Sequence, residues 1–411
     1  MESTRSVVVG VAGGIAAYKA CHIIRAFKEK GDDVHVIPTP SALKFVGKAT
    51  FEALSGNPVS TEVFDAVEQV RHVHLGADAD LVVVAPATAD FMARVAAGRA
   101  DDLLSATILM ATCPVVFAPA MHTQMWENPA TIANVATLRS RGISVLEPAD
   151  GRLTGKDSGA GRLPEPEQIV QLAEAVVHGV TLQPTLHGKK VVISAGGTRE
   201  NIDPVRFIGN YSSGRQGFAL AEIAAQRGAQ VQIVAGMTEQ LPLPSGAELI
   251  RVQSTQQMEK AINEHSYDAD IVIMAAAVSD FRPESTAMAK LKKGMSDDAL
   301  RRIELVENPD ILKGLVERRQ AQEQLGDQII VGFAAETGDA THSALDLAKR
   351  KLMKKGCDFI VFNDVSGGNV FGRSDNQGFL LGARGDVTQI PLGTKLEVAA
   401  RIFDKIEEAL G

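Results

Sequence analysis

One stretch of the chain, residues 194–217, concentrates groups that could hold a phosphate. It reads SAGGTRENIDPVRFIGNYSSGRQG, and its two glycine turns lie between an apolar run and an alanine-rich segment. Glycine lets backbone N–H groups approach a ligand closely, and the N-terminus of a helix favours an anion. The spacing from Gly209 to Gly214 is that of a Walker loop, but Arg215 and Gln216 stand where that loop needs Lys and Ser or Thr. The stretch therefore predicts phosphate binding of a different kind.

The polar side chains of this stretch can bind and polarise a substrate, but they contain no nucleophile paired with a base. Asn210 precedes Tyr211, Ser212 and Ser213, so that one amide and three hydroxyl groups are close in sequence. This composition is typical of a site that stabilises charge on a substrate.

Two groups of lysines in the second half could complete a site for a triphosphate. The first lies in the run KLKK at residues 290–293, and the second is the pair Lys351 and Lys355, which share one face of a predicted helix. A charge run is more often a solvated loop. Asp280, at the end of an expected strand, could meet a metal or a ribose hydroxyl, although a lone acid there is more often a cap.

Two histidines, His72 and His74, alternate on a possible strand and would point to one face. A zinc site would need a third ligand at suitable spacing, and none is nearby. A single imidazole that titrates near neutral pH is the better functional interpretation. From the residues alone, a structural histidine is favoured over it.

Apolar runs alternate with helical patterns along the whole chain. The expected strands lie at residues 6–11, 34–37, 81–85, 115–118, 191–193, 231–234, 271–275, 328–333 and 358–362. This alternation predicts an α/β fold of two Rossmann-like or flavodoxin-like three-layer domains with mainly parallel sheets. A C-terminal β-hairpin is expected at 379–391, and Thr394 with Glu397 predicts a capping box for the last helix.

The expected domains are residues 1–180 and 191–411, joined by a linker at 181–190 that contains Pro184 and Gly188. Residues 147–166 carry four glycines and three prolines, which predicts a long polar loop, either a lid or an irregular surface segment.

Composition excludes several classes of function. The chain has 411 residues with 42 basic and 50 acidic side chains, a formal charge of −8, so a nucleic-acid partner is not expected. No apolar run reaches the length of a membrane span, and no signal segment is apparent. The three cysteines form no CxxC motif, which favours a cytoplasmic protein. A two-domain NAD(P) oxidoreductase would need a GxGxxG turn, and neither glycine turn has that form.

Taken together, the motifs resemble the bifunctional phosphopantothenoylcysteine decarboxylase/phosphopantothenate-cysteine ligases of coenzyme A biosynthesis. In the first half, GGIAAYK, HVHLGADADL, APATADFMARVAAGRADDLLS and PAMHTQMW resemble the flavin-containing cysteine decarboxylases. In the second half, the glycine-rich stretch with AAAVSDFRP, KLKK, ENPDIL, VGFAAET and FNDVS resembles the ligase. The motifs occur in order over nearly the whole chain, which makes the resemblance specific.

For the second half, the resemblance implies a ligase that joins 4'-phosphopantothenate to L-cysteine with CTP and Mg2+, through an acyl-cytidylate. It implies Asn210 and Lys290 as catalytic residues and Asp280 as the residue nearest a metal. The implied nucleotide-binding residues are Ala275, Ala276, Asp280, Asn308, Pro309, Asp310, Ile311, Phe333, Lys351 and Lys355.

For the first half, the resemblance implies decarboxylation of 4'-phosphopantothenoylcysteine with FMN. His72 and His122 are the implied catalytic residues, and the implied FMN neighbours are Gly14, Thr39, Thr88 and Ser105. The family also implies a homo-oligomer in which decarboxylase trimers and ligase dimers build a larger shell, a dodecamer.

The chain departs from the family at two places. His122 stands where the family has Asn in its PxMNxxMW motif, and residues 153–158, in the family's flap, contain no Cys. The missing Cys leaves a second hypothesis, an active ligase whose amino-terminal half is a flavin-binding assembly module with weak catalysis. His72 speaks against that hypothesis.

Overall fold

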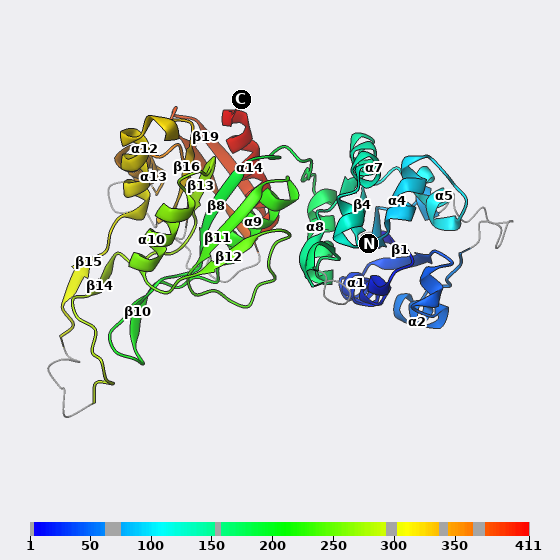
Figure 1. The fold of residues 1–411 in the computed structure, drawn as a ribbon, viewed down its shortest axis with the longest axis horizontal. Coiled ribbons are helices and arrows are strands. Elements are labelled where there is room, and N and C mark those ends of the chain that lie inside the picture. Colours follow the sequence, from blue (N-terminus) through cyan, green and yellow to red (C-terminus); the bar gives the residue numbers. More distant parts are fainter. Residues whose placement is uncertain are drawn as a thin grey trace. The chain divides into compact units, whose positions relative to one another are not determined.

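The computed structural model describes residues 4–61, 75–152, 158–292, 302–336, 344–364 and 375–410. The chain divides into two compact units, Met1–Gln183 and Pro184–Gly411 (Figure 1). Each unit is an α/β structure around its own sheet, so the expected fold class is confirmed. In the described part of the chain, no helix combines the length and the apolar character that crossing a bilayer requires.

The first unit contains a five-stranded parallel sheet in the order β2-β1-β3-β4-β5, which is the flavodoxin order. Its strands are β1 (Ser6–Val11), β2 (Asp33–Pro38), β3 (Leu81–Ala87), β4 (Val115–Pro119) and β5 (Ser144–Val145). Every residue of β3 is buried, as expected of a strand covered on both faces. Strand β2 lies on one side of β1, and β3 lies on the other. The strand order therefore reverses at β1, and a crevice opens beyond the carboxyl ends of β1 and β3.

Helices cover this sheet because their apolar residues recur at helical spacing. In α1 (Ala20–Glu29), Ala20, Ile23, Ile24 and Phe27 are buried on one face. The other helices are α2 (Lys48–Ser55), α4 (Ala89–Ala96), α5 (Leu103–Met110), α6 (Thr123–Trp126), α7 (Pro129–Ser140) and α8 (Pro166–Val177), with a 3-10 turn η1 (Ile15–Lys19) after β1. Helix α1 contacts α8, and α4 contacts α7.

The segment 147–166 differs from the loop expected there. It contains two short strands, β6 (Ala149–Arg152) and β7 (Ser158–Arg162), that pair antiparallel. Gly151, Gly159 and Gly161 have φ between +142° and +147°, a conformation that L side chains rarely adopt. The glycines that suggested an irregular loop therefore shape a two-stranded ribbon.

The second unit contains an eight-stranded sheet in the order β12-β11-β8-β13-β16-β17-β18-β19. Its strands are β8 (Lys190–Ala195), β11 (Gln230–Ala235), β12 (Glu248–Arg251), β13 (Ile271–Met274), β16 (Ile329–Glu336), β17 (Phe359–Asp364), β18 (Asp375–Gly382) and β19 (Val387–Thr394). The first six in spatial order pair in parallel, in the Rossmann order that reverses between β8 and β13. Strands β18 and β19 form the expected hairpin.

The helices of the second unit are α9 (Arg215–Gln226), α10 (Thr255–His265), α12 (Ile311–Ala321), α13 (Ala344–Lys355) and α14 (Lys395–Leu410). Helix α14 packs against α9 and β19. The expected capping box is present, because Thr394 Oγ1 accepts from the Glu397 amide at 3.3 Å and Glu397 Oε2 from the Thr394 amide at 3.2 Å. Arg227, after α9, pairs with Asp404 and Glu407 of α14.

Two small antiparallel ribbons were not expected from the sequence. The first pairs β9 (Arg199–Asn201) with β10 (Phe207–Gly209), and the second pairs β14 (Phe281–Pro283) with β15 (Leu305–Glu307). Strands β9 and β14 contact each other, and Figure 1 shows β10, β14 and β15 extending away from the sheet. Strands of three residues are too short to show an alternating pattern.

The packing of α14 gives a test of the second core. Phe403 is fully buried, so Phe403→Ala is expected to destabilise the second unit by about 3–5 kcal/mol because it leaves a cavity. The matched control is Leu392→Ala, since Leu392 is 68% exposed and its truncation should change stability by less than about 0.5 kcal/mol. Thermal unfolding of both variants measures the difference. Equal melting temperatures would contradict the packing described.

Candidate functional site

A pocket of about 990 Å3 opens at the carboxyl edge of the first sheet. Each of four parallel strands contributes the residues that follow it: Gly13 and Gly14 after β1, Thr39 after β2, Thr88 after β3, and His122 after β4. These residues are distant in sequence and meet because parallel strands end at one edge. Gly14, Thr39, Thr88 and His122, all predicted site residues, therefore line one pocket.

Gly13 is required by close packing at the floor of this pocket. A Cβ atom at Gly13 would lie 2.4 Å from the Ser41 Cβ and 2.8 Å from the Ser41 carbonyl carbon. At Gly14, a Cβ would meet only the Thr88 methyl group, at 3.8 Å. Gly13 thus allows the turns after β1 and β2 to pack together. Gly14 is not crowded, so a ligand in the pocket can approach its backbone.

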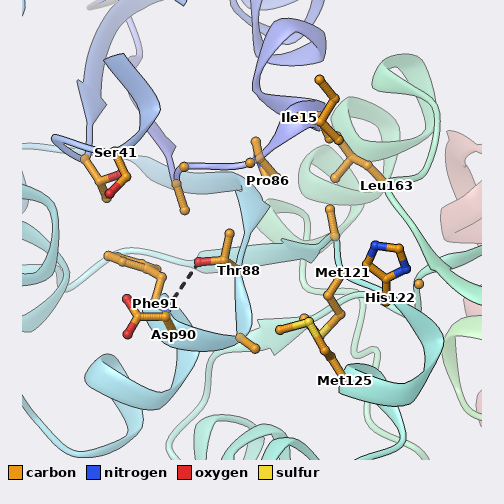
Figure 2. Close-up of a pocket in the computed structure, with 18 of the residues that line it drawn as sticks. Ile15, Ser41, Pro86, Thr88, Asp90, Phe91, Met121, His122, Met125 and Leu163 are labelled. Carbon is orange, nitrogen blue, oxygen red and sulfur yellow. Dashed lines mark hydrogen bonds between the residues drawn. The ribbon is translucent and has the colours of Figure 1, made fainter. Parts of the chain in front are cut away.

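The polar lining is supplied by helix starts and hydroxyl groups. Thr88 is the N-cap of α4, and its Oγ1 accepts from the Phe91 amide at 3.3 Å, as Figure 2 shows. Thr39 Oγ1 accepts from the Ala42 amide at 3.3 Å. Small side chains and backbone amides that face a cavity can hold the polar edges and the phosphate of a flavin nucleotide, so the pocket fits that class of ligand.

His122 occupies the opposite side of the pocket from Ser41. Figure 2 places its ring near Met121, Met125 and Leu163. His122 is at the N-cap position of α6, but its side chain makes no cap hydrogen bond. An imidazole here can donate to a substrate carboxylate, as the amide of Asn would.

Ser105 does not line the pocket. It is fully buried in α5, where its amide and its Oγ both donate to Asp102 Oδ1 at 2.8 Å. Asp102 itself lines the pocket and pairs with Arg94 at 2.8 Å. Any influence of Ser105 on a ligand within this unit would pass through Asp102, a residue that the sequence reasoning missed.

Charged residues of both signs line the pocket: Lys19, Arg94, Arg152 and Arg162, together with Asp90, Asp101 and Asp102. Arg94 forms ion pairs with all three of these acids. Hydrogen bonding to Arg94 lowers the pKa of Asp101. His72 and the flap residues 153–157 lie outside the described residues, so the structure places neither.

A second site lies at the switch point of the larger sheet, between β8 and β13. The turn after β8 is held to its neighbours, because Gly197 bridges to both Met237 and Ala277. A Cβ at Gly196 would lie 2.4 Å from the Met237 carbonyl oxygen, and one at Gly197 would lie 2.6 Å from the Asn210 carbonyl oxygen. Any larger residue at these two positions would clash with backbone atoms of the same chain, so the glycines are needed for the fold itself.

Asn210 lies directly after β10 and reaches the turn that follows β13. Its Nδ2 donates to the Val278 carbonyl oxygen at 3.0 Å. Ala275 and Ala276 begin the same turn, and the Ala276 amide donates to Ser194 Oγ at 3.1 Å. The structure thus brings Asn210, Ala275 and Ala276 to one edge of the sheet.

A buried polar network beneath this edge was missed by the sequence reasoning. Thr255 Oγ1 lies 2.8 Å from Glu200 Oε1, 3.1 Å from Thr198 Oγ1 and 3.3 Å from Asn308 Nδ2. The same Asn308 Nδ2 donates to the Ser279 carbonyl oxygen at 2.9 Å. Glu200 and Thr255 are ordinary polar residues in the sequence, and only the fold shows that they fix Asn308.

The segment Asn308–Ile311 leads into α12. Asp310 caps this helix, with Oδ1 accepting from the Lys313 amide at 3.1 Å. Lys355, on α13, forms an ion pair with the Asp310 carboxylate. Burial alone would raise the pKa of Asp310, but Lys355 and the Lys313 amide outweigh it and hold that pKa below its usual value.

The remaining predicted residues lie on several segments of the second unit. Phe333 is half-buried in β16, Lys351 is on α13, and Asp280 and Lys290 are exposed. The Asp280 carbonyl oxygen accepts from the Asn308 amide at 2.8 Å. Among the described residues, no group of three or more His, Cys, Asp or Glu side chains is arranged to hold a metal ion.

Comparison with known proteins identifies the two units. Residues 1–178 match the Flavoprotein family, and residues 186–410 match the family of the DNA/pantothenate metabolism flavoprotein C-terminal domain. The chain is therefore a flavoprotein joined to a domain of pantothenate metabolism.

The relatives extend over the full length. The chain is 56% identical over 403 residues to the coenzyme A biosynthesis bifunctional protein CoaBC of Mycobacterium tuberculosis, covering 98% of this chain and 96% of the relative. It is 54% identical to that of Mycolicibacterium smegmatis, covering 99% and 98%, and 43% identical to that of Bacillus subtilis, covering 99% and 97%. The chain belongs to the family of coenzyme A biosynthesis bifunctional proteins.

This family assignment confirms the predicted activities. The chain is a bifunctional enzyme that carries out two consecutive steps of coenzyme A biosynthesis, a ligase step and a decarboxylase step. The alternative of an amino-terminal module with weak catalysis is not favoured, because the full-length relatives carry both domains.

The floor of the first pocket gives a test of flavin binding. Gly13→Ala should lower flavin content by roughly tenfold or more, because the new methyl group displaces Ser41 and closes the turn. Visible absorption of the purified protein measures the bound flavin. Gly47→Ala is the matched control, since a Cβ at Gly47 has no neighbour within 4 Å. Equal flavin content in both variants would contradict the role given to this turn.

Proposed function

We propose that the ligase reaction takes place at the carboxyl edge of the larger sheet and the decarboxylase reaction in the pocket of the smaller one. The ligase proposal is carried by one observation: Asn210, Asn308 and the Asp310–Lys355 pair, from separate segments, meet around the switch point. Such a crevice is where open α/β sheets bind ligands.

The chemistry of the ligase requires an activated carboxyl group. The carboxylate of 4'-phosphopantothenate is a poor electrophile, so its oxygen attacks the α-phosphate of CTP and pyrophosphate leaves. The amine of L-cysteine then attacks the carbonyl carbon of the acyl-cytidylate, and CMP leaves as the amide forms. Negative charge builds on the departing phosphates, and cations fixed nearby lower that barrier.

We assign the phosphates to Lys290, Lys351, Lys355 and the start of α12 at Asn308, Pro309, Asp310 and Ile311. The N-terminus of a helix favours an anion. The ion pair with Asp310 holds the Lys355 amine near this N-terminus. Ala275, Ala276 and Phe333 are assigned to the cytidine, where small and flat side chains leave room for the base.

Asn210 is assigned to the acyl-cytidylate. Its Nδ2 already points into the turn after β13, where it donates to the Val278 carbonyl oxygen at 3.0 Å. An uncharged amide can donate to an oxyanion without competing as a nucleophile. Mg2+ would accompany the triphosphate, and the exposed carboxylate of Asp280 is the residue assigned to approach it.

The flavin of the first unit is proposed to be FMN, held by Gly14, Thr39 and Thr88, with Ser105 acting through Asp102. When bound, FMN supplies the reversible oxidation of the cysteinyl thiol that makes loss of carbon dioxide possible. His122 would orient the substrate carboxylate by donating a hydrogen bond, and His72 is assigned as the second catalytic residue. Met121 and Leu163, which are buried at the pocket wall, would exclude water around the reacting group.

We further propose that the protein is a cytoplasmic homo-oligomer, a dodecamer of decarboxylase trimers and ligase dimers. Its substrates are 4'-phosphopantothenate, L-cysteine and CTP. All three cysteines are free thiols, which suits a reducing compartment.

Removal of the Asn210 amide tests its assignment. Asn210→Ala should lower CTP-dependent amide formation by about 100-fold, the scale of one oxyanion donor. Asn263→Ala, on the last turn of α10, is the matched control. Amide formation is measured with purified enzyme, and decarboxylation of added 4'-phosphopantothenoylcysteine should stay unchanged in both variants. An Asn210→Ala enzyme with wild-type ligase activity would refute the assignment.

The Asp310–Lys355 pair gives a second test. Lys355→Met should raise the KM for CTP by roughly tenfold because it removes a cation from the phosphate site and leaves Asp310 unpaired. The neighbouring Lys354→Met is the control, since Lys354 is exposed. An identical KM in both variants would count against Lys355.

The same pair predicts a pH dependence of stability. Because the folded-state pKa of Asp310 is depressed, its contribution is present above the unfolded pKa of about 3.9 and is lost as pH falls through the folded value. The melting temperatures of wild type and Lys355→Met should therefore differ at neutral pH and converge as the pH falls through the folded-state pKa of Asp310.

A further inference from the structure

The turn between β9 and β10 contains a buried carboxylate that contacts two loops. Asp203 is 1% exposed, and its Oδ1 accepts from the amides of Val205 and Arg206, both at 2.8 Å. Its Oδ2 accepts from Arg206 Nη1 at 2.6 Å and from the Leu291 amide at 3.2 Å. The first three bonds stay within the turn. The fourth reaches a distant segment and is not needed to form the turn.

Leu291 is held on both sides of its backbone. Its amide donates to Asp203, and its carbonyl oxygen accepts from Arg206 Nη1 at 3.2 Å. Because both polar groups of this residue are bound, its backbone dihedrals are restricted, and the direction of the chain is set at the adjacent Lys290 and Lys292. Both lysines are exposed.

The same ribbon makes two more contacts with the segment that carries Lys290. The Ala287 amide donates to the Ile202 carbonyl oxygen at 2.9 Å, and Thr286 Oγ1 donates to the Asn201 carbonyl oxygen at 3.0 Å. The other end of the ribbon leads through β10 directly to Asn210. One small ribbon therefore connects the segment of Lys290 with the segment of Asn210.

We propose that Asp203 is a positioning residue of the ligase, which with Arg206 holds the Leu291 backbone and so places Lys290 relative to Asn210. The proposal rests on the function proposed for Lys290 in binding the phosphates of CTP. Asp203 is buried, and its four hydrogen bonds go to groups of the chain itself. A lysine side chain has four rotatable bonds, so fixing its backbone reduces the ordering that ligand binding requires.

The charge of Asp203 suits this role. Burial would raise its pKa, but the amides of Val205, Arg206 and Leu291 and the charge of Arg206 outweigh it and lower that pKa. The carboxylate is therefore ionised at neutral pH and accepts all four hydrogen bonds.

The variant Asp203→Asn is designed to weaken the contact with Leu291 while keeping the hydrogen bonds to the two turn amides. The retained oxygen can still accept from the two turn amides, whereas the new NH2 group faces two donors, the Leu291 amide and the Arg206 guanidinium. The KM for CTP is expected to rise roughly tenfold, with a smaller change in kcat. Decarboxylation of 4'-phosphopantothenoylcysteine by the same protein should be unchanged. The matched control is Asp268→Asn, an acid paired with Lys190 at the start of β8, which should keep the wild-type KM.

A double variant distinguishes positioning from a merely structural role. If Asp203 acts through Lys290, Asp203→Asn in a Lys290→Ala background should leave the KM for CTP within about twofold of Lys290→Ala alone. If the double variant instead raises the KM for CTP by the product of the two single-variant increases, the positioning proposal is overturned and the function proposed for Lys290 is not. A Lys290→Ala enzyme with the wild-type KM overturns the function proposed for Lys290, and the positioning proposal falls with it.

If Asp203→Asn lowers the yield of folded enzyme, Leu291→Pro tests the same contact from the other side. Proline removes the amide hydrogen that Asp203 accepts and leaves every bond within the turn intact. A KM for CTP raised as in Lys290→Ala supports the proposal. A wild-type KM in Leu291→Pro overturns it.

Discussion

The structure depends on one constraint: strands that run parallel all end at the same edge of their sheet. Where the strand order reverses, the connecting helices cover opposite faces and leave a crevice at that edge. The first unit reverses between β1 and β3, and the second between β8 and β13. Gly14 and Thr88 follow β1 and β3, and Ala275 and Ala276 follow β13. One folding rule therefore brings candidate residues of both units to a sheet edge from segments far apart in sequence.

The two sites use this crevice in different ways. In the first unit, close packing of the turns after β1 and β2 leaves an open pocket large enough for a flavin nucleotide. In the second, the edge is supported by buried hydrogen bonds, with Thr255 in contact with Glu200, Thr198 and Asn308. A buried network of this kind is rigid when its groups are satisfied, which keeps polar side chains in place before a ligand binds.

The sequence predicted the architecture well because apolar runs and glycine turns are local signals. It predicted the main strands, the C-terminal hairpin and the capping box of Thr394 and Glu397. It did not predict the ribbons β6–β7, β9–β10 and β14–β15, whose strands are short or rich in glycine. It also missed Asp203, Glu200 and Thr255, because their importance comes from partners that only folding brings near. Ser105 stays a predicted FMN neighbour; in the structure its hydrogen bonds go to Asp102. His72 and the flap at 153–157 remain predictions.

The central claim is that CTP binds at the carboxyl edge of the larger sheet, over the turns that follow β8 and β13. Hydrogen–deuterium exchange of the full chain with and without CTP measures this directly. Slower exchange is expected at the amides of residues 196–198, 276–279, 308, 310 and 311. Protection confined to the amino ends of the strands, at residues 189–190 and 268–270, would contradict it.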